Sequence, residues 1–123
     1  MEILRTPDEC FDNLEDYPFE PNYIDIEHQG QTLRMHYLDE NSESEEIVLL
    51  MHGEPTWSYL YRKIIPILVS NGKRVIAPDL IGFGKSDKPA SREYYSYANH
   101  IIWVETLIKK LDLKNITFFA QDW

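Results

Sequence analysis

Three short apolar runs, separated by stretches with helical patterning, constrain the fold of this chain most strongly. The runs are Ile47–Met51, Arg74–Pro78 and Ile116–Ala120. The first is continuously apolar, which is typical of a strand covered by helices on both faces. The last is rich in β-branched and aromatic residues and indicates another buried strand. Strands that alternate with helices predict a mostly parallel sheet with right-handed crossovers, that is, an α/β fold.

The two stretches between these runs are expected to be helices. The first covers about residues 57–69, and Pro66 should kink or divide it. The second begins after Ser96, a residue type that caps helices, and runs to about Leu111. Four apolar residues with helical spacing should lie on one face of it: Ile101, Val104, Ile108 and Leu111.

The chain is expected to begin with an irregular arm over residues 1–21, followed by a partial core domain over residues 22–123. The arm is acidic and contains three prolines. It should lie on the body through four apolar side chains: Phe11, Leu14, Tyr17 and Phe19.

The core domain should open with an antiparallel hairpin. Residues 23–27 and 33–38 each alternate apolar and polar side chains around a turn at Gly30-Gln31. Such alternation predicts two strands with one face exposed to water.

Composition excludes several classes of protein. The chain has 43% hydrophobic and 27% charged residues, as soluble globular chains do, and a net charge of −9. Nucleic acids and anionic membranes are therefore not expected as partners, because Lys and Arg would have to neutralise their phosphates. No segment approaches the length of an apolar membrane span. Cys10 is the only cysteine, so no internal disulfide is possible and a cytoplasmic location is expected.

The residues with the clearest chemical meaning follow the last apolar run. A small residue, any residue, a nucleophile, any residue and a small residue form the sharp turn after a strand in α/β-hydrolases. Here Ala120 takes the first small position and Asp122 that of the nucleophile, whereas the second small position would be residue 124. We therefore expect a nucleophilic aspartate at Asp122, in the front portion of a longer hydrolase. From its position alone, Asp122 fits an aspartate that caps a following helix equally well.

A second motif, His52-Gly53-Glu54-Pro55, follows the first apolar run. In α/β-hydrolases this loop supplies one backbone N–H of the oxyanion hole, and the residue after the nucleophile supplies the other. The donors here would be the amides of Glu54 and Trp123, with His52, Gly53 and Pro55 shaping the loop. His52 is expected to be structural, because the catalytic histidine of this fold comes last in the chain. The alternative is a plain strand-to-helix turn with a satisfied histidine.

The glycine-rich segment Gly82–Ser86 does not fit a phosphate-binding loop. A Walker A loop requires glycine where Asp79 stands, and a dinucleotide fingerprint requires a small residue where Asp87 stands. We expect a rigid loop in which Asp79 and Ser86 form hydrogen bonds with the backbone.

No metal or other cofactor is expected. The histidines outside the motif lack the spacing of metal ligands: His28, His36 and His100.

With these motifs in place, the chain resembles the haloalkane dehalogenases. The likeness runs over essentially all 123 residues and is strongest in 52–62 and 120–123. It implies that Asp122 is the nucleophile and that Trp123 binds halide through its indole N–H. In the subgroup that carries glutamate at the position of Glu54, a cap-domain tryptophan beyond residue 123 is the second halide donor.

The resemblance also implies the reaction. An ionised carboxylate displaces halide from a saturated carbon without needing a base, and N–H donors stabilise the departing halide. A histidine-activated water then hydrolyses the alkyl ester. The implied partners are a small halogenated alkane, halide ion and water; the products are an alcohol, halide and a proton. The parent protein is expected to be a monomer.

The resemblance further implies that the catalytic histidine, its acid partner, the cap and the last strands lie outside this chain. We therefore expect the 123-residue polypeptide to be inactive by itself and to expose an apolar strand edge that favours aggregation. Two alternatives remain open. One is an epoxide hydrolase, which shares the aspartate nucleophile but typically has histidine where Gln121 stands. The other is a non-catalytic remnant of the hydrolase fold.

Overall fold

The computed structural model describes residues 2–12, 14, 17–52 and 57–120. Within these residues, a five-stranded sheet has the order β2-β3-β5-β4-β7. Its strands are β2 (Asn22–His28), β3 (Gln31–Glu40), β4 (Ile47–Met51), β5 (Arg74–Pro78) and β7 (Ile116–Ala120). β4 is parallel to β5 and β7, whereas β3 is antiparallel to both β2 and β5. The predicted α/β fold, with a hairpin leading into a parallel sheet, is confirmed.

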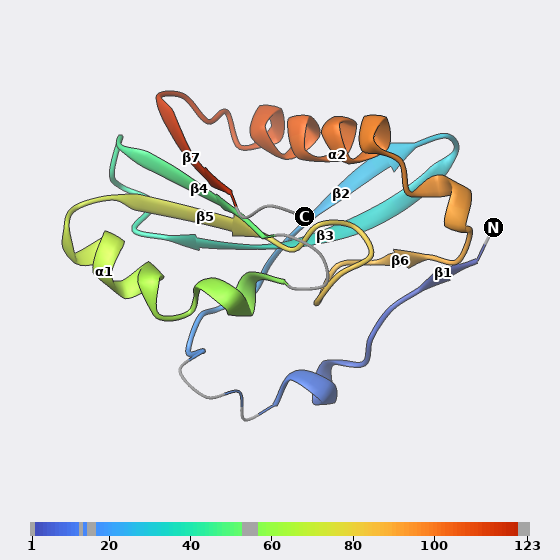
Figure 1. Ribbon diagram of the computed structural model, residues 1–123, viewed down its shortest axis with the longest axis horizontal. Helices are drawn as coiled ribbons and strands as arrows, with labels where there is room; N and C mark the ends of the chain where they lie inside the picture. The colour runs from blue at the N-terminus through green and yellow to red at the C-terminus, as the bar shows by residue number, and fades with distance from the viewer. Residues whose placement is uncertain (1, 13, 15–16, 53–56, 121–123) are drawn as a thin grey trace.

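Two helices cover opposite faces of this sheet (Figure 1). Helix α1 (Ile64–Ser70) connects β4 to β5, and α2 (Tyr97–Lys110) leads from β5 to β7 on the other side. The two connections run in opposite directions across the sheet, so right-handed crossovers require opposite faces. The apolar side chains of β4 and β5 therefore alternate between two cores. Leu49 and Ile76 pack on the side of α2, whereas Leu50 and Val75 pack on the side of α1.

The first predicted helix is divided, but not at the proline. A 3₁₀ helix, η2 (Ser58–Tyr61), precedes α1, so the break comes before Pro66. Pro66 is the third residue of α1, where a backbone N–H would have no partner within the helix. Proline is therefore tolerated at this position.

Helix α2 begins where it was predicted to begin, and its predicted face is buried in part: Ile108 and Leu111 pack against the core. The Ser96 side chain accepts a hydrogen bond from the Asn99 amide at 3.0 Å, as expected for a cap. The fully buried residues are Trp103 and Leu107, whereas Ile101 is 47% exposed. Trp103 stacks on a tyrosine of the preceding 3₁₀ helix η3 (Arg92–Tyr94) and donates to His28 of β2. These contacts turn α2 toward the hairpin.

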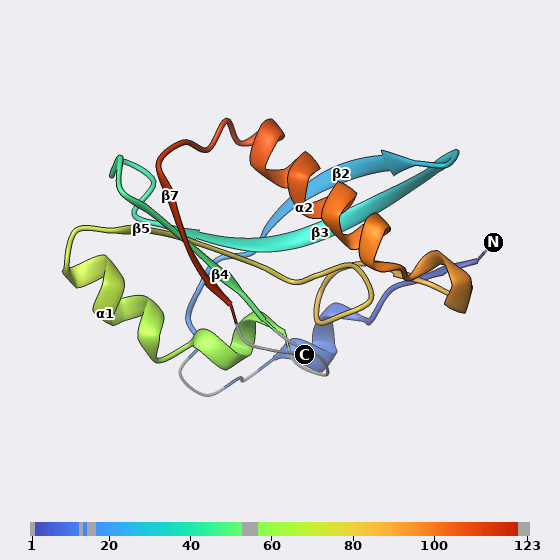
Figure 2. The same ribbon diagram turned by 45° about the horizontal axis from the view of Figure 1, so that its top comes forward.

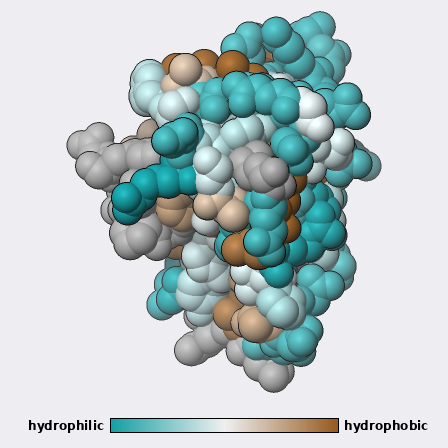
Figure 3. Space-filling view, turned by 90° about the vertical axis from the view of Figure 1, so that its right-hand side faces the viewer, coloured by the Kyte–Doolittle hydropathy of each residue, from teal (hydrophilic) through white to brown (hydrophobic). Residues whose placement is uncertain are grey.

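The hairpin turn lies one residue earlier than predicted. Gln29 and Gly30 have φ of 51° and 78°, as in the two-residue turns that match the twist of paired strands, and Gln31 already pairs with His28. The end of the molecule that carries this turn is largely hydrophilic (Figure 3). The prediction of one wet face is wrong for residues 35–38 of β3, which are all buried. The loop over residues 79–87 covers this part of the strand.

Strand β7 forms an edge of the sheet and is not buried as the sequence pattern predicted. Phe118 and Phe119 are 59% and 52% exposed. Alternate residues of a strand point to opposite faces, so neither side of β7 is fully covered in the described part of the chain. This agrees with the expected apolar edge. None of the described helices is long and apolar enough to cross a membrane.

The N-terminal segment, residues 2–19, is tied to the body by contacts that the sequence did not indicate. A short strand, β1 (Ile3–Leu4), pairs with β6 (Lys88–Pro89). Beside it, the Arg5 guanidinium donates two hydrogen bonds to the Asp87 carboxylate, at 2.5 and 2.9 Å. The division of the chain into an arm and a core domain stays a prediction.

A buried carboxylate fixes the loop after β5. Asp79 accepts hydrogen bonds from the amides of Ser58 and Lys85 at 2.6 and 2.9 Å, and its Oδ2 lies 2.8 Å from His36 Nδ1. The Ser86 hydroxyl donates to the Asp79 carbonyl and accepts from the His36 amide. The prediction that Asp79 and Ser86 bond to the backbone is confirmed. Burial alone would raise the pKa of Asp79, but the His36 ring and the two amides outweigh it and hold this pKa below its ordinary value.

We predict that Asp79→Asn lowers the free energy of unfolding by about 3 kcal/mol, because a buried ring and amide lose their charged acceptor. Urea denaturation measures the loss, and Asp25→Asn, an exposed carboxylate, is the control. The pKa of Asp79 is lower in the folded protein than its ordinary value of 3.8. The carboxylate therefore stabilises the fold above pH 3.8, and this stabilisation is lost as the pH falls further. The difference between wild type and variant should therefore shrink below pH 3.8. Equal effects of the two substitutions at neutral pH would contradict the assigned role.

The Ser96 cap gives a second prediction. Ser96→Ala should cost about 1 kcal/mol of stability, since an amide in the first turn of α2 loses its acceptor. Ser91→Ala is a matched control, because Ser91 precedes η3 without a side-chain cap bond. Thermal unfolding of both variants tests the prediction, which fails if Ser91→Ala is as destabilising as Ser96→Ala.

Candidate functional site

The carboxyl ends of the parallel strands meet at one edge of the sheet. β4 ends at Met51, which pairs with Ala120 at the end of β7, and β5 ends beside them at Pro78. The chain leaves β4 and β5 for helices on opposite faces, as Figures 1 and 2 show. In open α/β sheets, ligands bind in the crevice outside such strand ends. In the sequence, the two motifs singled out above come directly after β4 and β7.

Most of the predicted site residues lie outside the described residues. These are Gly53, Glu54, Pro55, Asp122 and Trp123. Their roles as loop-shaping residues, oxyanion donors, nucleophile and halide donor stay predictions. The described residues around them still define how this edge of the sheet is built.

His52 links the end of β4 to the start of the loop after β5. Its side chain is fully buried, and its Nε2 accepts a hydrogen bond from the Leu80 amide at 2.9 Å. The rings of His52 and Phe83 make an edge-to-face contact, with their centroids 5.3 Å apart. A ring nitrogen that accepts from an amide carries no proton, so His52 is neutral in this arrangement. The geometry agrees with the structural role expected for His52, which stays a prediction.

Asp79 also joins the loops after β4 and β5, through the amides of Ser58 and Lys85. The close approach of these loops requires a glycine at residue 84. Gly84 has φ of 52°, and a Cβ there would lie 2.5 Å from Asp79 Oδ2 and 2.8 Å from the Trp57 ring. The sequence marked Gly84 as part of a rigid loop. It gave no sign that Ser58 would be a partner of Asp79, because the two are 21 residues apart.

An aromatic cluster covers these loops; it consists of Phe11, Tyr17, Trp57 and Tyr59. Trp57 stacks on Tyr59, and the rings of Phe11 and Tyr17 lie 5.2 and 5.4 Å from that of Trp57. The Tyr17 hydroxyl is 2.8 Å from the Ser58 hydroxyl. The sequence predicted that Phe11 and Tyr17 lie on the body. It did not show that they do so beside the candidate site.

Tyr17, in this cluster, and Lys88, near it, have shifted pKa values. Burial, and then the charge of Asp79, raise the pKa of Tyr17 despite its hydrogen bond with Ser58. Tyr17 therefore keeps its phenolic proton throughout the neutral range. Burial lowers the pKa of Lys88, an effect partly offset by Asp79 and Asp87. The Lys88 ammonium donates to the carbonyls of Gly84 and Ser86, which further fixes the loop.

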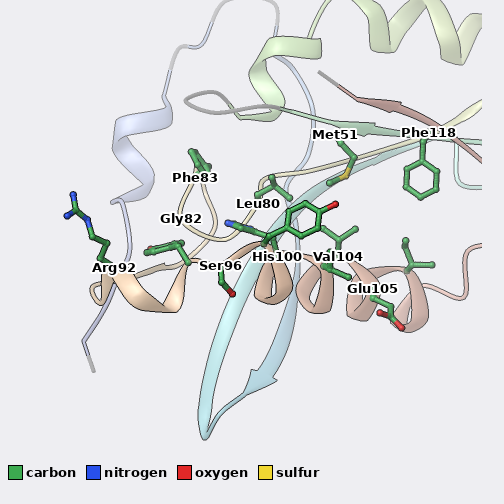
Figure 4. Close-up of a pocket in the computed structure, with 14 residues that line it drawn as sticks. Met51, Leu80, Gly82, Phe83, Arg92, Ser96, His100, Val104, Glu105 and Phe118 are labelled. Carbon is green, nitrogen blue, oxygen red and sulfur yellow. The ribbon is translucent and has the colours of Figure 1, made fainter. Parts of the chain in front are cut away.

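A cavity of about 1040 Å³ lies beside this edge, between α2 and the strands β4 and β7 (Figure 4). Apolar side chains such as Met51, Val104 and Phe118 line much of it. The charged side chains of Arg92 and Glu105 are at opposite ends in Figure 4 and cannot act on one group together. The described residues that line the cavity thus offer mainly apolar packing, and Arg92 and Glu105 form no pair among them. Among the described residues, no group of three or more His, Cys, Asp or Glu could hold a metal ion.

Comparison with known proteins gives close relatives over the whole chain. A haloalkane dehalogenase from Psychrobacter cryohalolentis is 57% identical over all of this chain and 41% of its own length. One from Mycolicibacterium paratuberculosis is 54% identical with the same coverage. The tetrameric haloalkane dehalogenase DpaA from Paraglaciecola agarilytica superposes with a TM-score of 0.94 at 50% identity, over all of this chain and 42% of that one. The chain thus spans about two fifths of the length of these relatives.

More distant solved structures include an epoxide hydrolase from Vigna radiata. It is 31% identical, with a TM-score of 0.70, and the match covers 85% of this chain and 32% of that one. A family model for the alpha/beta hydrolase fold matches residues 46–123. This match covers more than half of the chain and contains the sheet edge described above, so the chain belongs to the α/β hydrolase fold family.

Proposed function

We propose that the protein to which this chain belongs is a haloalkane dehalogenase, which converts small haloalkanes to alcohols and halide. The identity of 57% to such an enzyme, over the whole of this chain, carries the proposal. The match to the epoxide hydrolase from Vigna radiata covers 85% of this chain and has 31% identity. The fold alone does not separate the two activities, because both superpose on the same sheet.

In this proposal Asp122 attacks the carbon that bears the halogen. In the sequence it follows the end of β7 by two residues, and ligands in this class of fold bind outside the carboxyl ends of the strands. Its oxygen forms a bond to carbon while the carbon–halogen bond breaks, which yields an alkyl ester and a halide ion. A carboxylate is ionised at neutral pH, so it needs no base for this step. The indole N–H of Trp123 donates to the departing halide and stabilises the charge that develops there.

The second step returns the carboxylate. Water adds to the ester carbonyl of Asp122, and the amides of Glu54 and Trp123 hold the negative oxygen of the intermediate. The bond between the carbonyl carbon and the alkoxy oxygen then breaks, and the alcohol leaves with a net release of one proton. We assign no general base within residues 1–123, which correspond to 41% of the relative's length. We also propose a cytoplasmic location, based on the single cysteine.

The epoxide hydrolase alternative remains a second candidate, supported by the match to the Vigna radiata enzyme. Gln121 precedes the proposed nucleophile where epoxide hydrolases typically carry histidine, which favours dehalogenation. A monomeric parent stays a prediction. DpaA, at 50% identity, is described as tetrameric.

The proposal predicts halide release by the full-length product of the reading frame that contains this sequence. With 1-bromobutane and 1,2-dichloroethane as substrates, Asp122→Asn should reduce release about a thousandfold or more, because an amide is a poor nucleophile. Asp112→Asn is the matched control, since Asp112 is exposed and its φ of 51° suits asparagine. Halide release that survives in Asp122→Asn would remove Asp122 from its role. Hydrolysis of styrene oxide without halide release would favour the alternative activity.

A further prediction concerns halide binding. Trp123→Phe keeps an aromatic ring but removes the N–H, so bromide should bind about tenfold more weakly to the full-length protein. Calorimetric titration with sodium bromide measures the affinity. An unchanged affinity would show that Trp123 is not a halide donor.

A further inference from the structure

The N-terminal segment contacts both loops that flank the candidate site. Near its start, Arg5 binds Asp87 in the loop after β5. Farther along, Phe11 packs on Trp57, and the Tyr17 hydroxyl bonds to that of Ser58 in the loop after β4. In Figures 1 and 2 this segment runs past the carboxyl end of the sheet. A segment that only filled space on the body would not need polar contacts to both loops.

Ser58 is held from two directions. Its amide donates to Asp79 Oδ1 at 2.6 Å, and its hydroxyl is 2.8 Å from that of Tyr17. Both Ser58 and Asp79 are fully buried, so water does not compete for the bond between them, whereas Tyr17 is half-buried. Asp79 anchors the backbone of this residue, whereas Tyr17 anchors its side chain.

The loop after β4 is therefore tethered at two described points. His52, at its start, accepts from the Leu80 amide, and Ser58, at its end, is bound by Asp79 and Tyr17. Glu54, the proposed oxyanion donor, lies between these points in the sequence. Ser58 and Glu54 are four residues apart, so the bonds that hold Ser58 act close to the proposed oxyanion donor in the sequence.

We propose that Tyr17 is a positioning residue, which through Ser58 aligns the loop after β4 for hydrolysis of the alkyl-enzyme. The inference rests on the proposed function, in which the Glu54 amide stabilises an oxyanion. That oxyanion forms when water adds to the ester carbonyl; no such charge arises when Asp122 displaces halide from saturated carbon. Loss of the Tyr17–Ser58 bond should thus slow the second step and leave the first nearly unchanged.

Other features of Tyr17 suit this role. Its ring contacts those of Trp57 and Tyr59 at 5.4 and 5.5 Å, which fixes the direction of its hydroxyl. The Lys85 ammonium lies 5.3 Å from the centre of the same ring, on the loop after β5. Tyr17 therefore contacts both loops at once. Tyr17→Phe removes one oxygen and retains these ring contacts.

The test uses the full-length protein and rapid-quench mass spectrometry with 1-bromobutane. We expect Tyr17→Phe and Ser58→Ala each to slow hydrolysis of the ester about tenfold, while formation of the ester changes less than about twofold. The adduct on Asp122 should then accumulate, and kcat and KM should fall together. Because both substitutions remove one hydrogen bond, the double variant should be no slower than either single variant. Tyr97→Phe is the control, since Tyr97 is 84% exposed.

Several results would overturn the inference. One is a Tyr17→Phe variant that hydrolyses the ester at the wild-type rate. Another is equal slowing of both steps, and a third is additive effects in the double variant. If Tyr17→Phe unfolds, Ser58→Ala alone decides, because it breaks the same bond from the other side. A wild-type protein that releases no halide would refute the proposed function and this inference together. An active wild type with an unaffected Tyr17→Phe refutes the inference alone.

Discussion

The carboxylate of Asp79 is the group on which the carboxyl end of the sheet depends. It lies directly after β5, fully buried, and its oxygens engage the Ser58 amide, the Lys85 amide and the His36 ring. A charged group without such partners would not remain in the interior. With them, one side chain connects the loop after β4, the loop after β5 and strand β3. Gly84 is part of the same constraint, because any side chain there would collide with Asp79.

This arrangement gives the candidate site its framework. Parallel strands deliver their carboxyl ends to one edge, and the contacts of Asp79, His52 and Tyr17 hold the loops that leave that edge. Chemistry at such an edge needs fixed donors, because dipoles that are already oriented need no reorganisation when charge develops. The proposed reaction uses this property twice, for the departing halide and for the ester oxyanion. The N-terminal segment, distant in sequence, adds to the same rigidity.

Much of the fold could be predicted because its signals are local. The continuous apolar run of β4 and the serine cap of α2 each lie within a few residues, and both predictions are confirmed. The face of α2 was predicted only in part, because Trp103 is fixed by partners in β2 and η3, which helical spacing cannot reveal. For the same reason, the links from Tyr17 to Ser58 and from Asp79 to Ser58 were missed. The motif residues Glu54, Asp122 and Trp123 were found from local spacing, and their roles stay predictions.

In the proposed reaction, the oxygen of the product alcohol comes from Asp122 and not directly from water. Single turnover of the full-length protein on 1-bromobutane in water enriched in oxygen-18 tests it most directly. We expect an alcohol without the label and an enzyme that has gained one labelled oxygen in the peptide containing Asp122. Labelled alcohol from the first turnover, with an unlabelled enzyme, would contradict it.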